Sequence, residues 1–148
     1  AAEPNPPTWC DNVKVITPGQ SDAQSIVNAI WEENGGNVPS DNGQWSESRY
    51  AILFEPGTHN VAVNVGYYTQ VMGLGRTPSQ TNVQDLWSPN GDFSVSIGAL
   101  NNFWRSVENF YVTPQQGQNS VIWAVSQAAP MRRMHIQGDL WLFQVNWP

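Results

Sequence analysis

The chain has 148 residues, which suits one domain with a moderate core, and 40% of them are hydrophobic, which excludes a disordered acidic chain. Its formal net charge is −6 with only 6 lysines and arginines, so we expect no nucleic acid partner. No apolar run approaches the roughly 18 residues of a membrane-spanning helix, so we expect no membrane partner either.

Residues 1–12 are rich in proline and are expected to form an extended arm ahead of a domain over residues 13–148. The arm begins Ala-Ala-Glu-Pro, which is typical of a mature N-terminus left after a leader is cleaved, so we expect a secreted, extracellular protein. Cys10 is the single cysteine. It has two interpretations, an inert free thiol or an interchain disulfide with a second polypeptide.

A short strand is predicted at Val13–Ile16, and one helix follows it over about residues 21–34. Ser21 and Gln24 fit a capping box that would start the helix. Asn34-Gly35-Gly36 would end it. Between these signals apolar residues recur at helical spacing, at Ala23, Ile26, Val27, Ile30 and Trp31.

From Arg49 onward, short apolar runs bounded by turn residues predict a series of strands. The candidates are 51–54, 61–65, 71–74, 83–86, 93–97, 104–112, 121–125, 131–136 and 140–143. A spacing of about 10 residues suits an antiparallel sandwich or barrel as well as a parallel β-helix. Periodicity alone does not separate these architectures.

Two observations favour the β-helix, an open stack in which each coil needs a neighbour. Segments 71–74, 107–110 and 133–136 look like one strand repeated on successive coils, 36 and then 26 residues apart. Asn-Gly signals for hairpins between neighbouring strands are also few. The predicted helix would then shield the apolar end of the first coil.

Four segments carry a resemblance to a known family: SDAQSIVNAIWEENGG, AILFEPGTHNVAVNVGYYTQVMGLG, LNNFWRSVENFYVTP and IWAVSQAAPMRRMHIQGDLWLF. They resemble the N-terminal part of secreted, pectate-lyase-like β-helix proteins akin to the family 55 glycoside hydrolases, which are exo-β-1,3-glucanases. The resemblance covers about residues 13–143. It implies an all-β fold, a right-handed parallel β-helix with one N-terminal capping helix. Because such relatives run for several hundred residues, it also implies that the C-terminal end is incomplete and that another chain or segment completes the coils.

Glycoside hydrolysis usually needs two carboxyl groups about 5 to 10 Å apart. No spacing among the 12 acidic residues singles out such a pair, so the catalytic residues stay unknown. Glu108 is predicted to pair with its neighbour Arg105. With two histidines and one cysteine, no metal site is predicted, and the sequence gives no sign of a cofactor. Roles in turns or on the surface are the simpler interpretation of Glu55, Asp85, Asp92 and Asp139.

The candidates for substrate binding are Trp87, Trp104, Arg133 and His135. Aromatic rings, including Tyr67, Tyr68, Trp123 and Trp141, can present their faces to the C–H surfaces of sugars. Core packing is the alternative for Trp104 and Trp123, whereas Trp45 and Trp87 lie in polar loops and are expected to be exposed or to meet a partner. Strand alternation would place Arg133 and His135 on one face, opposite Arg132 and Met134, where they could contact a sugar or form an ordinary surface pair.

The function that follows is part of a secreted carbohydrate-active enzyme, hydrolysing polysaccharide with a carboxylate pair in a groove shared with further polypeptide. The expected partners are a polysaccharide or oligosaccharide and a second chain that completes the β-helix. Two alternatives stay open. One is a non-catalytic, lectin-like glycan-binding module, and the other is a structural or toxin subunit that assembles through its open β-edge.

Overall fold

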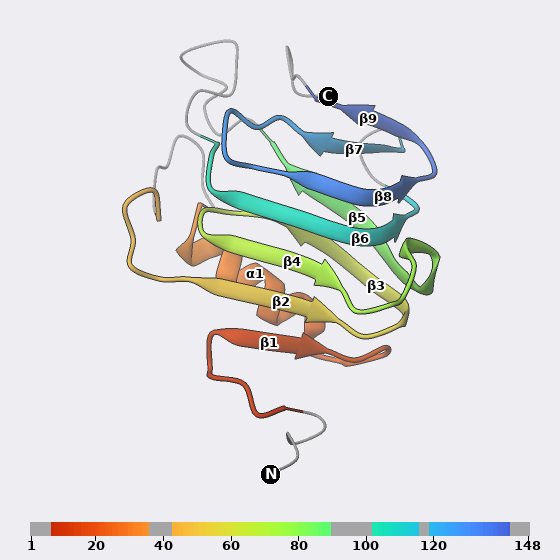
Figure 1. Cartoon of the computed structure of the whole chain (residues 1–148), viewed down its shortest axis with the longest axis horizontal. Coiled ribbons are helices and arrows are strands. Elements are labelled where there is room, and N and C mark those ends of the chain that lie inside the picture. The colour runs from red at the N-terminus through yellow and green to blue at the C-terminus, as the bar shows by residue number, and fades with distance from the viewer. Residues whose placement is uncertain (1–6, 36–42, 90–101, 116–118, 143–148) are drawn as a thin grey trace.

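The computed structural model describes residues 7–35, 43–89, 102–115 and 119–142, and Figure 1 shows them as a stack of strands beside one helix. The elements are β1 (Val13–Ile16), α1 (Ala23–Glu33), β2 (Tyr50–Phe54), β3 (Gly57–Asn64), β4 (Thr69–Gly73), the 3-10 turn η1 (Pro78–Gln80), β5 (Thr81–Ser88), β6 (Arg105–Val112), β7 (Ser120–Trp123), β8 (Met131–Ile136) and β9 (Asp139–Trp141). In these ranges no helix has the length and apolar character to cross a membrane.

Every strand pairing among the described residues is parallel, which rules out an antiparallel sandwich or barrel for this part of the chain. One layer stacks β1, β2, β4, β6 and β8, and β3 and β5 lie in a second layer behind it (Figure 1). β6 joins the layers, because its first residues pair with β4 while Tyr111 and Val112 pair with β5. The expectation of a largely β fold with parallel strands and one helix is therefore confirmed.

The core fills the space between the two layers and α1 with apolar side chains. These side chains align from one strand of a layer to the next, and we call each such strand, with the corner residues beside it, a rung. Ile52, Val71 and Val107 occupy successive positions of one such column, and all three are buried. Phe54 and Phe110 meet edge to face with ring centroids 5.6 Å apart. Each buried side chain of this size contributes about 1.5–3 kcal/mol relative to an exposed one, so stacking is the main source of stability.

Helix α1 is close to its predicted bounds, but the predicted capping box is wrong. Asp22 occupies the N-cap position, and no side chain caps the helix there. Gln24 instead reaches β3, where its amide accepts a hydrogen bond from the Ala62 N–H and donates to the Ala62 carbonyl, each at 2.9 Å. The side-chain amide of Gln24 both donates and accepts, so it satisfies the two backbone groups of Ala62, and this contact fixes α1 against the second layer.

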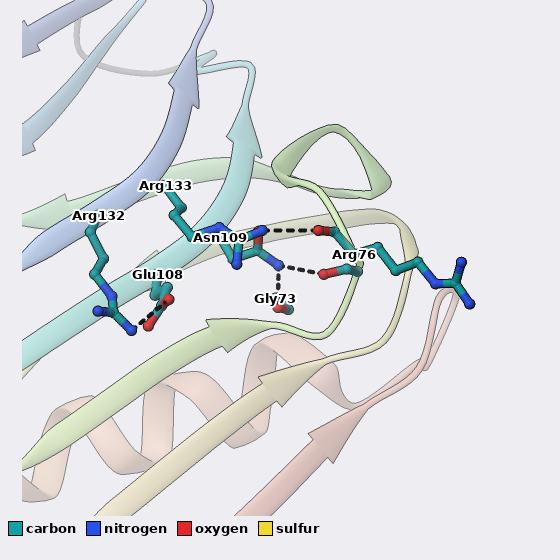
Figure 2. A network of polar contacts seen from close by, with 7 residues as sticks. Gly73, Arg76, Glu108, Asn109, Arg132 and Arg133 are labelled. Atoms are coloured by element: carbon teal, nitrogen blue, oxygen red, sulfur yellow. Dashed lines mark hydrogen bonds and ion pairs between the residues drawn. The ribbon is translucent and has the colours of Figure 1, made fainter.

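Bends within β6 and β8 place non-glycine residues in the left-handed region. Asn109 (φ 66°) and Arg133 (φ 53°) take equivalent positions on β6 and β8, where the backbone bends between layers. Figure 2 shows the Asn109 amide facing Gly73 and the Arg133 guanidinium reaching the carbonyl of Arg76, at 2.9 Å. A left-handed residue costs roughly 1–2 kcal/mol in general, so these contacts offset a strained backbone.

This corner corrects two predictions about β8. Val107 pairs with Met131, so 131–134 rather than 133–136 is the counterpart of 107–110. The left-handed residue also breaks the alternation, since Arg132 and Arg133 are both exposed whereas Met134 is half-buried. Simple period-2 reasoning fails wherever one residue of a strand lies outside the β region.

Candidate functional site

A hollow of about 1150 Å³ lies on the outer face of the first layer, at the N-terminal ends of its strands. Its floor is one register row across β1, β2, β4 and β6, formed by Val13, Ala51, Gln70 and Ser106. The remaining lining residues are Cys10, Asn12, Arg49, Tyr50, Tyr68, Trp104, Arg105, Ala128 and Pro130. We call this hollow the groove.

One wall of the groove is a column of stacked side chains, the corner column, defined by Arg49, Tyr68, Trp104 and Ala128. The guanidinium of Arg49 lies 3.5 Å from the centre of the Tyr68 ring. The rings of Tyr68 and Trp104 stack with centroids 5.2 Å apart and an interplanar angle of 24°. Backbone bonds hold these rungs together, from the Tyr50 N–H to the Tyr68 carbonyl (3.0 Å) and from the Tyr68 N–H to the Trp104 carbonyl (2.6 Å).

Three members of the corner column share an uncommon backbone conformation. Tyr68, Trp104 and Ala128 have φ values of 52°, 55° and 52°. Bulky residues with positive φ are uncommon, and such strain tends to occur where a structure holds a side chain for a purpose. Here the shared bend directs successive side chains into one stack.

Ala128 is the next rung after Trp104. The Ser126 N–H donates to the Asn102 carbonyl (2.9 Å) and the Val107 N–H donates to the Pro130 carbonyl (3.1 Å), which brings Ala128 level with Trp104. Its methyl group ends the column of rings, and Trp104 is 40% exposed. The column is therefore closed at Arg49 and open above Trp104.

Arg105 anchors the corner from below. It is 3% exposed and donates hydrogen bonds to the Val65 carbonyl (2.8 Å) and to the Ser88 hydroxyl (3.1 Å). Its guanidinium also lies 4.6 Å from the centre of the Tyr67 ring. Burial lowers the pKa of Arg105 to about 10, an effect that the Tyr67 side chain partly opposes.

The predicted pairing of Arg105 with Glu108 is wrong, because Arg105 points into the molecule while Glu108 remains on the outer face. Glu108 forms an ion pair with Arg132 of the next rung, at 2.9 Å (Figure 2). Because the strands stack in parallel, Arg132 on the neighbouring rung lies closer to Glu108 than Arg105 does, although Arg105 is only three residues away in the same strand. This contact lies at the corner of β6 and β8 and does not line the groove.

Of the predicted binding residues, the structure brings only Trp104 to the groove. Trp87 lies in β5 and is half-buried, so the expectation of a polar loop is wrong there. Arg133 binds the Arg76 carbonyl, and the exposed His135 packs edge to face on Tyr111 at 4.6 Å. A substrate role for these three residues stays a prediction.

The predictions for Trp123, Trp45, Trp104 and Cys10 have different outcomes. Trp123 is buried and donates to the Ala129 carbonyl at 3.0 Å, which confirms core packing. The exposure of Trp45 is confirmed, and this residue meets Trp104 edge to face at 5.6 Å. Core packing of Trp104 is wrong. Cys10 is exposed and free within this chain, and an interchain disulfide stays a prediction.

Acidic side chains do not line the groove among the described residues. Asp85 is buried within β5 and accepts the Gln115 N–H at 2.9 Å, so its expected role in a turn or on the surface is wrong. Glu55 and Asp139 lie beside bends of the chain. His59 is buried, and its Nε2 contacts the Glu55 carbonyl at 2.8 Å. Asp92 lies outside the described residues. Within the described ranges no group of three or more His, Cys, Asp or Glu residues could hold a metal ion.

Sequence reasoning missed Arg49 and Ala128 as members of the site. Each corner residue directly precedes a strand or lies just before one, yet the separations along the chain are 19, 36 and 24 residues. Such irregular coil lengths conceal the repeat. The signal that could have found it is an Arg, Tyr or Trp placed immediately before Tyr50, Thr69 and Arg105.

The chain is similar to known proteins. No family model matches the chain. An exo-beta-1,3-glucanase of Streptomyces sp. (strain SirexAA-E / ActE) is 41% identical over 135 residues, which cover 87% of this chain and 20% of the relative. The chain thus spans about a fifth of the length of that relative.

Two solved structures of sacteLam55A from Streptomyces sp. SirexAA-E are also similar. A variant in complex with glucose matches with a TM-score of 0.77 and 37% identity, over 90% of this chain and 23% of that one. A second structure matches with a TM-score of 0.76 and 36% identity, over the same shares. The resemblance to family 55 glycoside hydrolases expected from the sequence is confirmed.

Proposed function

We propose that this chain, similar in sequence and fold to family 55 glycoside hydrolases, is part of a secreted β-helix enzyme that hydrolyses β-1,3-glucan. One observation carries the proposal: 41% identity to an exo-beta-1,3-glucanase extends over 87% of the chain. At that identity the stacked strands, corners and outer face described above are expected to be shared. The neighbour bound to glucose supports a carbohydrate ligand.

The right-handed parallel β-helix belongs to this proposal. Successive rungs pair in parallel, β6 and β8 bend from one layer toward the other, and corner residues recur in register. These features are those of coils rather than of an open sheet with crossover helices. The remaining coils would then be supplied by another segment or chain, since the relatives extend well beyond the matched region.

Hydrolysis of a glycosidic bond requires catalytic groups that the described residues of the groove do not provide. Hydrolysis by an acid and a base or nucleophile needs two carboxyl groups flanking the bond, and the groove has none among its described lining residues. We therefore assign the catalytic carboxylate pair to parts of the enzyme outside the described residues. The described chain contributes scaffold and binding surface.

A lectin-like glycan-binding module is the second candidate. An aromatic groove whose described lining residues include no carboxylate suits such a module, and it is the observation that favours this alternative. The two candidates differ in whether a longer polypeptide carrying this chain turns over its ligand.

The deciding experiment compares this 148-residue chain with a longer polypeptide that contains it. Both are incubated with β-1,3-glucan and, as a linkage control, with β-1,4-glucan, and released sugars are separated by chromatography. We expect the longer polypeptide to release glucose or short oligosaccharides from the β-1,3-glucan only, and the shorter chain to release none. Binding without release by both would support the module and contradict the enzyme. Recovery of the protein in the culture medium tests secretion.

A further inference from the structure

We infer that the open face of Trp104 is a stacking platform for one pyranose ring of a neutral saccharide, with Ala128 providing the room for that ring. The inference rests on the proposed function for the identity of the sugar, a β-1,3-linked glucose unit. It assigns a binding subsite to the part of the groove beside Trp104 and Ala128.

Three of the four rungs of the corner column carry a flat group. Arg49 covers one face of Tyr68, and Trp104 stacks on Tyr68 as the next rung. Parallel strands lie about 4.8 Å apart, which is close to the separation of stacked rings. At the fourth rung Ala128 carries only a methyl group, so one ring-sized layer beside Trp104 holds no protein ring.

The space at this rung is open to solvent. Trp104, Ala128 and Pro130 all line the groove, and Trp104 is 40% exposed. The floor at this rung is Pro130, whose carbonyl accepts the Val107 N–H, and Ser106 lies one rung below it. A sugar ring above Trp104 would therefore have the hydroxyl of Ser106 beside it.

Chemistry selects a neutral saccharide. A β-glucose ring with equatorial hydroxyls presents axial C–H bonds, and these carry partial positive charge toward the negative face of an indole. Both cations of the groove are already engaged, Arg49 on Tyr68 and Arg105 on buried oxygens and Tyr67. No described lining residue is acidic. An anionic or cationic ligand would thus gain little here.

The platform is held rigidly before any ligand arrives. The 2.6 Å bond between the Tyr68 N–H and the Trp104 carbonyl fixes the backbone, and the next residue, Arg105, is buried and hydrogen-bonded to the Val65 carbonyl. Trp45 meets the ring edge to face. A rigid aromatic face loses little conformational entropy on binding, which favours affinity.

Two substitutions test the platform from opposite sides. Trp104→Ala removes the ring, whereas Ala128→Tyr adds a ring that fills the open layer; Tyr68 shows that tyrosine accepts this backbone conformation. We expect each to weaken binding of a neutral β-1,3-gluco-oligosaccharide, laminaritriose, by about tenfold in isothermal titration calorimetry. Trp104→Phe should restore most of the affinity. Leu142→Ala, at an exposed apolar residue outside the groove, is the control and should bind as the unaltered chain does.

Thermal melting of every variant separates binding from folding, and Ala128→Tyr keeps the test valid if Trp104→Ala does not fold. Unchanged affinity in Ala128→Tyr, or a flat titration of the unaltered chain at millimolar saccharide, would overturn the inference. A flat titration combined with shielding of Trp104 in the longer polypeptide would identify a protein segment as the occupant and overturn it too. If the longer polypeptide hydrolyses the glucan and Trp104→Ala leaves its KM unaltered, the stacking role of Trp104 is contradicted and the proposed function stands. If the longer polypeptide binds the saccharide through Trp104 but does not hydrolyse it, the stacking role stands and the proposed enzymatic function is contradicted.

Discussion

The side-chain amide of Asn109 donates hydrogen bonds to two carbonyls of the preceding rung, those of Gly73 and Gly75, each at 2.7 Å. Asn109 is 4% exposed and has a φ of 66°. One residue therefore provides both the bend of β6 and the hydrogen bonds that the rung below needs. Asparagine suits this position because it tolerates the left-handed region and carries an amide donor.

Asn109→Ala is expected to lower the free energy of unfolding by about 2–4 kcal/mol. The buried Gly73 carbonyl and the half-buried Gly75 carbonyl lose their donor, and alanine tolerates the left-handed region less well than asparagine. Urea denaturation followed by circular dichroism measures the change. Asn119→Ala is the matched control, because Asn119 also has a positive φ (60°) but is exposed, and it should lose less. Equal losses at both positions would contradict the role of the amide.

Gln24→Ala is expected to destabilise the protein by about 1–3 kcal/mol. The substitution removes a donor and an acceptor from the backbone of Ala62 at the surface between α1 and β3. Ser21→Ala should change the melting temperature very little, since Ser21 makes no helix cap. A larger effect at Ser21 than at Gln24 would restore the capping box predicted from the sequence. Differential scanning calorimetry of the two variants decides between them.

Arg105→Lys is expected to cost about 2–3 kcal/mol although it keeps the charge. One ammonium group cannot replace a planar guanidinium that reaches the Val65 carbonyl, the Ser88 hydroxyl and the Phe103 carbonyl. Arg132→Ala removes an ion pair whose arginine is 70% exposed and should cost less than about 1 kcal/mol. Chemical denaturation of both variants measures the contrast. A similar cost for both would show that burial of Arg105 contributes nothing.

We expect the Glu33 carboxylate to stabilise the folded chain at neutral pH and to lose this effect at acidic pH. Hydrogen bonds from the Ser48 and Tyr50 hydroxyls lower the pKa of Glu33 below its ordinary 4.5. A carboxyl whose pKa is lower in the folded state stabilises the fold above the unfolded pKa, and this contribution disappears as the pH falls through the folded value. Because Glu33 is exposed, the effect is small.

The measurement compares melting temperatures of the unaltered chain and Glu33→Gln at pH 7 and at pH 3. The variant should melt lower at pH 7, and the difference should shrink at pH 3. Tyr50→Phe removes one of the two donors and should show a smaller loss with the same trend. A difference that grows on acidification would contradict the assigned direction.

Local pattern determined much of this fold. The helix follows from apolar residues at helical spacing, and β1 and β8 have the bounds that their apolar runs predicted. The resemblance to family 55 glycoside hydrolases was likewise visible in quoted segments and is confirmed at 41% identity. Burial of apolar side chains is repeated at every rung, so it leaves a signal in each short stretch of sequence.

Only the tertiary structure decided the corners and the groove. Positive φ at Arg133 broke the alternation of β8, pairing with β6 set Met131 opposite Val107, and stacking across rungs gave Glu108 the partner Arg132 in place of Arg105. Arg49, Tyr68, Trp104 and Ala128 meet because unequal coils happen to end at one corner. The sequence specifies what each rung buries, but which outward-facing side chains become neighbours depends on the length of every intervening loop, and no local pattern records that.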